Sequence, residues 1–278
     1  MSVFKKTRAL LATCVLALSL ALVACGGGTA PAGGGTATDG ASDGAAFTTI
    51  EAGKILVGSD CDYPPFIYIE NGQAAGFEYE LAQAIGADLG YTVEYLPLQN
   101  FDTIIASVAA GSKMDIGFSS FTITDERKEL VDFSIPYFDS NQACVVMKGS
   151  GYTSTTDLAG LTVGAQSGTT GESWANENIP GVTVKGYNQT SEALAALAAG
   201  DVEAIFFDEP VATEQVSTAY TDCEVIAVIP TGEQYGIAIS KDNPGLTAAI
   251  NASLQRLVDN GTYAQLFSKY FDFEPTIS

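Results

Sequence analysis

The sequence predicts an α/β protein with two similar lobes, and three observations lead to this prediction. From about residue 47 onward, short runs rich in β-branched and aromatic residues alternate with stretches of helical period. A helix, a glycine-containing turn and a strand follow one another at 101–117, and the same order returns at 191–205. The 278 residues are 46% hydrophobic and 16% charged, which suits one large domain or two of ordinary size.

The alternation of strands and helices predicts parallel sheets that helices cover on both faces. We expect strands at 54–58, 91–96, 114–118, 143–147, 161–165, 182–186, 204–207, 224–228 and 235–239. We expect helices at 78–89, 101–110, 191–199 and 209–219.

The longest helical segment lies near the end of the chain. Asn243 and Pro244 are typical of an N-cap and a first turn. Gly261 is expected to end the helix before a last helical stretch at 263–271. The apolar stripe of this helix consists of Leu246, Ile250, Leu254, Leu257 and Val258.

The first 25 residues resemble an export signal. Three bases are followed by an uncharged, mostly apolar run at 9–24, which is short for a bilayer span and suits a signal-peptide core. A single anchoring helix remains the alternative. The ending Leu22-Val-Ala-Cys25 resembles the lipobox of bacterial lipoproteins. That resemblance implies a signal peptide at 1–24 and a lipid on Cys25, which becomes the new N-terminus.

The segment that follows, up to residue 46, is almost wholly Gly, Ala, Thr, Ser, Pro and Asp. Such a composition buries too little apolar surface to order itself, so we expect a flexible tether between the lipid and the folded part. The protein is therefore expected outside the cell membrane, held to its outer face by the lipid.

The charge balance excludes several kinds of function. The chain has 33 acids, 12 bases and no histidine, for a net charge of −21. Removal of residues 1–24 takes away three bases and no acids, so the mature charge is −24. A chain this poor in bases lacks the positive patch that nucleic-acid binding needs. Imidazole catalysis and histidine metal sites are excluded, and we expect no metal and no cofactor.

Three cysteines fall in the folded part: Cys61, Cys144 and Cys223. All lie in or beside apolar, strand-like runs, which favours small buried side chains. Export permits a disulfide without requiring one, so their pairing stays open.

Polar groups that follow predicted strands are the candidates for a binding site, because ligands bind outside the carboxyl ends of strands in open α/β sheets. Asp60 and Tyr63 follow the first strand, and Arg127 falls in the first turn of a helix that Thr124 is expected to cap. A cation is disfavoured at a helix N-terminus, so Arg127 indicates an anionic partner. Arg256, the other arginine of the mature chain, is expected on the solvated face of the long helix.

Together these motifs give a specific resemblance. Residues 50–273 resemble the amino-acid-binding branch of the extracellular solute-binding proteins that serve ABC importers. The matching motifs are Asp60…Tyr63-Pro-Pro-Phe66, Gly76-Phe-Glu78, Phe101-Asp102, Thr122-Ile-Thr-Asp-Glu-Arg127, Gly168-Thr-Thr170, Phe207-Asp-Glu209 and Asp259-Asn-Gly-Thr-Tyr263…Tyr270-Phe271.

The resemblance implies a two-lobe periplasmic-binding-protein fold of type II. The first lobe would hold 47–138 and 234–278, and the second lobe 139–233. The chain would cross between them near 136–138 and 229–232. A hinge closure would bury one amino acid between the lobes.

The resemblance also implies roles for the groups that hold the backbone of the amino acid. Arg127 and Thr122 would bind the α-carboxylate, with help from Thr170. Asp208 would accept the α-ammonium, supported by Ser120, although the neighbouring Glu209 is an alternative.

Five further residues would surround the ligand side chain. Tyr63 and Phe101 would sandwich its stem, although Phe101 could instead be an ordinary core residue. Asp60, Glu78 and Gln166 resemble the side-chain pocket of the family. Two carboxylates favour a basic ligand, while Gln166 could equally serve an amide. We therefore expect a polar or basic amino acid. Ser120 stands where relatives often carry Gly.

Two other functions are weighed against transport. Some relatives are dehydratases of cyclic precursors of aromatic amino acids, and Glu78 or Glu209 could be the general acid of such an enzyme. The absence of histidine and the presence of Asp208 favour a binding protein over this enzyme. A ligand-sensing surface domain is the other alternative. For the transport protein we expect an ABC permease as partner and a monomeric state.

Overall fold

The computed structural model describes residues 46–275. The expected signal peptide, the lipid on Cys25 and nearly all of the tether lie outside these residues. Within the described range, no helix is both long and apolar enough to cross a membrane.

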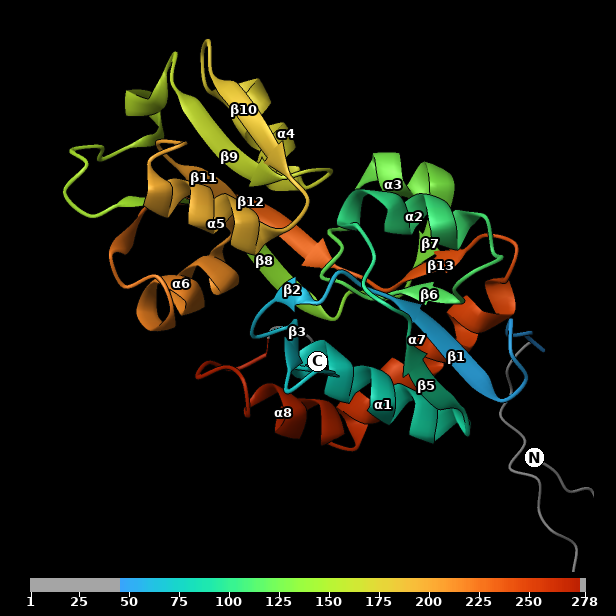
Figure 1. Ribbon diagram of the computed structural model, residues 1–278. Helices are drawn as coiled ribbons and strands as arrows, with labels where there is room; N and C mark the ends of the chain where they lie inside the picture. The colour runs from blue at the N-terminus through green and yellow to red at the C-terminus, as the bar shows by residue number, and fades with distance from the viewer. Residues whose placement is uncertain (1–45, 276–278) are drawn as a thin grey trace, which may run out of the picture. The chain divides into compact units, whose positions relative to one another are not determined.

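The first lobe is built on a five-stranded sheet in the order β5-β1-β6-β13-β7. Helices α1 and α7 contact it, and so do α2 and α3, which lie on the opposite side in Figure 1. The strands are β1 (Lys54–Gly58), β5 (Thr92–Tyr95), β6 (Ile116–Gly117), β7 (Val131–Phe133) and β13 (Ala238–Ser240). The helices are α1 (Phe77–Leu89), α2 (Phe101–Ala109), α3 (Asp125–Leu130), α7 (Pro244–Asp259) and α8 (Thr262–Phe267).

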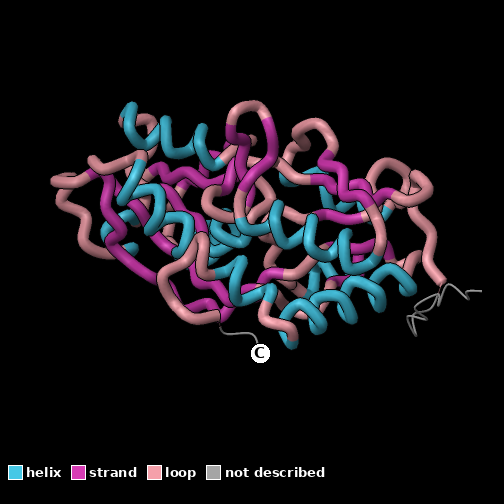
Figure 2. Tube along the Cα trace, turned by 90° about the horizontal axis from the view of Figure 1, so that it is seen from below, coloured by secondary structure: helices cyan, strands magenta, loops and turns pink. Residues whose placement is uncertain are grey.

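The second lobe is built on another five-stranded sheet, in the order β10-β9-β11-β8-β12. Helices α4, α5 and α6 contact its strands, and Figure 2 shows helices flanking the strands. The strands are β8 (Phe138–Met147), β9 (Thr162–Gln166), β10 (Thr183–Tyr187), β11 (Ile205–Asp208) and β12 (Cys223–Tyr235). The helices are α4 (Thr170–Asn178), α5 (Thr190–Ala199) and α6 (Glu209–Thr218), with a short 3₁₀ turn at Thr155–Leu158.

Both sheets are mixed, which corrects the expectation of parallel sheets. Strands β1, β5 and β6 are parallel, as are β9, β10 and β11. Strand β13 is antiparallel to β6 and β7, and β8 is antiparallel to both β11 and β12. The reason is the route of the chain: β8 enters the second lobe and β12 leaves it, so two neighbouring strands run in opposite directions.

A small antiparallel sheet lies in a region where no strand was expected from the sequence. It comprises β2 (Asp62–Tyr63), β3 (Ile67–Glu70) and β4 (Gln73–Ala75). Asn71 and Gly72 join β3 to β4 with φ of 51° and 81°. Two positive φ angles define a tight hairpin turn, and an Asn-Gly pair is its usual sequence signal.

The two lobes are joined where β8 begins and β12 ends. Phe138 stacks on Tyr235 at a centroid distance of 5.6 Å and on Phe267 at 5.7 Å. One hydrophobic cluster includes residues of both sheets, from Ile55 in the first lobe to Phe207 in the second. We keep the lobe boundaries at 138/139 and 233/234 as a proposal.

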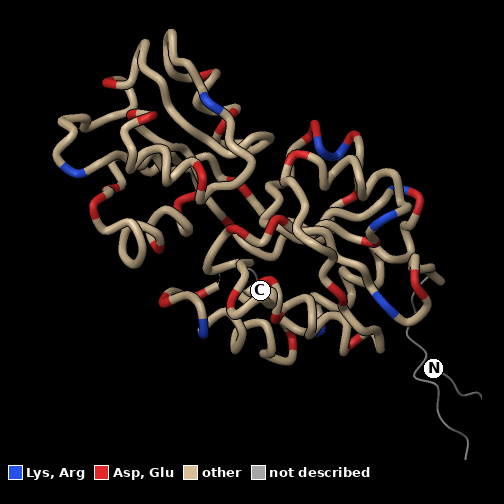
Figure 3. Tube along the Cα trace, viewed as in Figure 1, with Lys and Arg blue, Asp and Glu red and all other residues tan. Residues whose placement is uncertain are grey.

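Cys61, Cys144 and Cys223 are buried and unpaired, which confirms the interpretation as small core side chains. Burial raises the pKa of the Cys61 thiol to about 11 and that of Cys144 to about 12. The acidic residues are spread along both lobes rather than gathered in one place (Figure 3). Among the described acids, the buried ones are Asp60, Glu78, Asp115 and Asp208, so the others are at least partly exposed.

Candidate functional site

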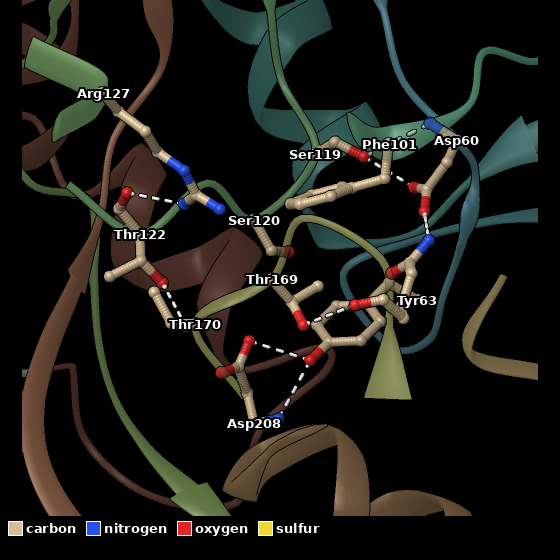
Figure 4. Close-up of a pocket in the computed structure, with 11 residues that line it drawn as sticks. Asp60, Tyr63, Phe101, Ser119, Ser120, Thr122, Arg127, Thr169, Thr170 and Asp208 are labelled. Carbon is tan, nitrogen blue, oxygen red and sulfur yellow. Dashed lines mark hydrogen bonds between the residues drawn. The ribbon is translucent and has the colours of Figure 1, made fainter. Parts of the chain in front are cut away.

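A pocket lies where strands of both lobes end, which is the usual ligand position in α/β sheets. Nine of the ten predicted ligand-binding residues line it, and only Glu78 does not. Figure 4 shows how their side chains converge. The eleven lining residues are Asp60, Tyr63, Phe101, Ser119, Ser120, Thr122, Arg127, Gln166, Thr169, Thr170 and Asp208.

Arg127 provides a cation at one side of the pocket. Thr124 caps helix α3 by accepting the backbone N–H of Arg127 at 3.2 Å, as the sequence predicted. The guanidinium donates to the carbonyl oxygens of Thr122 (2.8 Å) and of Gly168 in the other lobe (2.9 Å). It lies 5.6 Å from the ring centroids of both Phe101 and Phe121.

The guanidinium of Arg127 is half-buried, and desolvation lowers its pKa. Among residues 46–275 it forms no ion pair with a carboxylate, and only two of its five N–H groups are used. Arg256, in contrast, pairs with Asp88 on the surface at 2.5 Å, as expected for a solvated residue. An enclosed cation with free donors is suited to bind an anion.

Asp208 provides a buried carboxylate in the same pocket. Its Oδ2 accepts hydrogen bonds from the hydroxyls of Tyr63 (2.8 Å) and Tyr235 (2.6 Å), and its Oδ1 accepts one from the Gln142 amide. Burial, together with the nearby carboxylate of Glu233, raises the pKa of Asp208 to about 7. No Lys or Arg of the described chain pairs with it. Asp208 therefore lacks a cation.

The alternative binder Glu209 lies elsewhere. It is the first residue of α6, is partly exposed, and accepts a hydrogen bond from Thr213 at 3.2 Å. It does not line the pocket, so only Asp208 of this pair has access to a ligand.

A second carboxylate, Asp60, lies beside Ser119 and Gln166. It accepts hydrogen bonds from Ser119 Oγ and from Gln166 Nε2, both at 2.7 Å. Gln166 also donates to the carbonyl of Asn188 at 2.9 Å and accepts from Thr190 at 3.2 Å. Burial raises the pKa of Asp60. Like Asp208, it forms no ion pair within the described residues.

Two aromatic side chains that line the pocket also make contacts within the protein. The Tyr63 hydroxyl is bound to Asp208, so Tyr63 bridges the lobes as well as offering its ring. Phe101 stacks on Phe121 at 4.7 Å and is 8% exposed. Phe101 is therefore a core residue that also lines the pocket, so its burial in the core does not exclude contact with a ligand.

The position of Glu78 differs from the expected side-chain pocket. It is fully buried in the first turn of α1, behind Ser120, and its Oε1 accepts from the backbone and hydroxyl of Ser120. The start of α1 directly after Gly76 fixes this carboxylate inside the lobe, where a ligand in the pocket does not reach it.

Several polar residues near the site were not predicted. Ser119 and Thr169 line the pocket. Glu233, on β12, accepts hydrogen bonds from the hydroxyls of Thr122 (2.8 Å) and Thr170 (2.9 Å). Ser119 and Thr169 stand next to predicted residues, so their position in the sequence could have indicated them. Glu233 and Gln142 lie in the crossing strands, where no local pattern signals a ligand.

The chain is similar to proteins of a known family. The family model described as bacterial extracellular solute-binding proteins, family 3, matches residues 55–273. The L-cystine-binding protein TcyJ of Escherichia coli (strain K12) is 33% identical over 229 residues, which are 81% of this chain and 85% of that protein. The arginine-binding extracellular protein ArtP of Bacillus subtilis (strain 168) is 33% identical and covers 80% of this chain and 87% of its own length.

A solved structure shows the same similarity in three dimensions. The arginine-, lysine-, histidine-binding protein ArtJ of Geobacillus stearothermophilus superimposes with a TM-score of 0.75 and 33% sequence identity. The match covers 80% of this chain and 97% of that one. The two-lobe architecture is therefore shared over nearly all of the part that the structure describes.

Proposed function

Because the chain belongs to the bacterial extracellular solute-binding proteins of family 3, we propose that it captures one polar or basic amino acid between its lobes and delivers it to the permease of an ABC importer. The observation that carries this proposal is a pair of unmatched charges in one pocket. Within residues 46–275, Arg127 makes no direct ion pair with a carboxylate and Asp208 makes none with a Lys or Arg, although Asp208 and Glu233 lie near enough to Arg127 to favour its charged form. A free amino acid carries both missing charges.

The proposed binding mode follows from desolvation. A zwitterion that leaves water needs a partner for each charge, since an unpaired buried charge is costly. The α-carboxylate would accept from the unused N–H groups of Arg127, with Thr122 and Thr170 beside it. The α-ammonium would donate to Asp208 and to Ser120. Closure of the lobes would pair both charges and exclude water at the same time.

The side chain of the ligand would extend toward Asp60. This buried carboxylate has neutral donors but no cation, so a guanidinium or ammonium would complete it. The relatives named above bind arginine, lysine, histidine or L-cystine. Arginine and lysine carry a positive group at the far end of the molecule, which agrees with the unpaired Asp60, while L-cystine carries an ammonium beside a carboxylate there.

The protein is a binding protein rather than an enzyme, because the relatives over this length are binding proteins. Glu78, one of the two acids considered for a dehydratase, does not line the pocket, and neither does Glu209.

We also propose that residues 1–24 are cleaved and that Cys25 carries the lipid that tethers a monomer to the outer face of the cell membrane. The Leu22-Val-Ala-Cys25 sequence supports this anchoring. Mass spectrometry of the N-terminal peptide from bacterial membranes should find a lipid-modified Cys25. An intact signal sequence, or a Cys25→Ser variant that stays in the membrane fraction, would contradict the anchor.

A thermal-shift scan of the purified protein over the common amino acids and L-cystine tests the binding function, because a ligand of the folded state raises the melting temperature. We expect a clear shift with arginine, lysine or another polar amino acid. Tight binding that is confined to leucine-like or acidic amino acids would contradict the ligand class. The absence of a shift with every amino acid, confirmed by calorimetry, would contradict the function.

A further inference from the structure

Ser120 adopts an unusual backbone conformation in the wall of the pocket. Its φ is 50°, in the left-handed region that favours glycine, and it is 4% exposed. Within the described residues only Cys61 and Asn71 share a positive φ among non-glycine residues, and Asn71 lies in a hairpin turn. Such a conformation is strained for a residue other than glycine and persists only where the surroundings hold it.

Glu78 makes the contacts that hold Ser120. Its Oε1 accepts the backbone N–H of Ser120 at 2.9 Å and the Ser120 hydroxyl at 2.7 Å. The Tyr137 hydroxyl donates to the same oxygen at 2.5 Å. Both donors of Ser120 therefore end on one carboxylate oxygen, which fixes the residue at the backbone and at the side chain together.

This carboxyl group is buried without a charge partner among the described residues. Glu78 is 0% exposed, has no cationic partner, and its Oε2 is buried without a hydrogen bond. Burial raises the pKa of Glu78 to about 7, against the effect of the three hydrogen bonds. A buried carboxyl group without a cation is costly, so a structural benefit must offset it.

The same carboxyl connects the pocket to the crossing strands. Tyr137 directly precedes β8, and its ring lies 5.1 Å from that of Phe118 and 6.1 Å from that of Tyr235. Glu78 thus joins the pocket wall at Ser120 to the segment through which the chain leaves the first lobe.

We propose that Glu78 is a positioning residue that holds Ser120 in its left-handed conformation and thereby shapes the wall on which the amino acid binds. This inference rests on the proposed function for its effect on affinity. Its effect on the conformation of Ser120 is independent of any ligand. It replaces the expectation that Glu78 touches the ligand side chain.

The test is a mutant cycle with L-arginine as the probe, measured by calorimetry. Glu78→Met keeps a similar volume but removes the acceptor, and we expect about a tenfold loss of affinity. In the Ser120→Gly variant, glycine adopts a positive φ at position 120 without support from Glu78. In this background Glu78→Met should therefore reduce the affinity for L-arginine less than about threefold. Glu80→Gln, on the same helix but paired with Lys269, is the matched control and should bind like the wild type.

Glu78→Gln is the conservative variant, because its amide oxygen can still accept from Ser120. It should bind within about threefold of the wild type. Unchanged affinity of Glu78→Met, an equal loss in both backgrounds, or a large loss in Glu78→Gln overturns the positioning role.

A ligand-free crystal structure separates this inference from the proposed function. In Glu78→Met, or in Glu78→Gln if the Met variant does not fold, residue 120 is observed directly. We expect a negative φ at Ser120 in the Met variant and a positive φ in the Gln variant. A positive φ in the Met variant, or a negative φ in the Gln variant, overturns the inference whether or not L-arginine binds. If the wild type binds no amino acid, only the proposed function fails.

Discussion

The hydroxyl of Tyr63 donates a hydrogen bond of 2.8 Å to the Asp208 carboxylate and accepts one of 3.0 Å from the Asp208 backbone N–H. Tyr63 belongs to the small sheet β2-β3-β4 that packs on the first lobe, and Asp208 ends strand β11 of the second (Figure 4). One phenol therefore ties the lobes together at the group proposed to bind the α-ammonium. Closure of the lobes and the orientation of Asp208 are linked through this contact.

Tyr63→Phe should weaken amino-acid binding about tenfold, because the variant keeps the ring but loses the two hydrogen bonds between the lobes. Calorimetry measures the effect. Tyr68→Phe is the matched control, since the Tyr68 hydroxyl has no hydrogen bond to the described chain and its ring is half-buried. Equal affinities of Tyr63→Phe and the wild type would show that the bridge does not support closure.

Arg127→Ala should cost about 2–5 kcal/mol of binding free energy, because the ligand carboxylate would be buried without a partner. Arg256→Ala removes the other arginine of the mature chain, whose partner Asp88 is on the surface, and should leave binding unchanged. Calorimetric titration of both variants and of the wild type measures the three affinities. Wild-type affinity in Arg127→Ala would remove Arg127 from the site.

Asp208 should make the unliganded protein less stable as the pH rises. Its folded-state pKa is about 7, above the ordinary value of an aspartate, so the folded state alone keeps this proton between about pH 4 and 7. The contribution of protonated Asp208 to the free energy of unfolding is complete below about pH 4 and is lost as the pH rises through 7. The ligand ammonium favours the ionised form, so affinity should rise over the same range.

Urea unfolding of the wild type and of Asp208→Asn at pH 5, 6, 7 and 8 checks this dependence. In the wild type, Asp208 should lower the free energy of unfolding by up to about 1.4 kcal/mol per pH unit, and this contribution should be absent from the variant. Part of the wild-type slope should remain, since Glu78 has a similar pKa of about 7. A difference between the two proteins that stays constant with pH would contradict the assignment.

Asp60→Asn should reduce the preference for a cationic ligand. The change is isosteric and removes the charge proposed to face the ligand side chain, so arginine should bind about ten times or more weakly while glutamine is less affected. Competition between the two amino acids in one calorimetric experiment gives the ratio. Asp62→Asn tests for a general charge effect. An unchanged ratio in Asp60→Asn would place the ligand side chain elsewhere.

The cysteines of the folded part should be chemically inert. Cys61, Cys144 and Cys223 are buried, and burial raises the pKa of each thiol, so little thiolate is exposed. A maleimide should label them only after unfolding in urea, and a reducing agent should not change the melting temperature. Fast labelling of the folded protein at any of the three positions would contradict the described packing.

Much of the fold was accessible to sequence analysis because the periodic signals are strong. The stripe from Leu246 to Leu257 predicted α7, and the N-cap at Thr124 predicted the start of α3. The antiparallel strands were not accessible. A strand's direction depends on which lobe the chain enters next, and the apolar run at 143–147 looks like that of a buried parallel strand. The Asn71-Gly72 pair is the local sequence signal of the hairpin between β3 and β4.

The residues of the candidate site likewise comprise some that the sequence indicated and some that it did not. Arg127 was found because a lone arginine in the first turn of a helix is electrostatically unusual. The resemblance placed Asp208 and Asp60, which the structure brings into one pocket. Glu78 does not line the pocket, and sequence position cannot distinguish a carboxylate that faces a ligand from one that faces the backbone behind it. Glu233 and Gln142 reach Thr170 from the crossing strands, and only the three-dimensional arrangement reveals this.

A crystal structure of the protein with its amino acid tests the central claim most directly. The account predicts the α-carboxylate within hydrogen-bond distance of the Arg127 guanidinium and the α-ammonium within hydrogen-bond distance of the Asp208 carboxylate. An amino acid bound in the reverse orientation, or outside the pocket between the lobes, would contradict it.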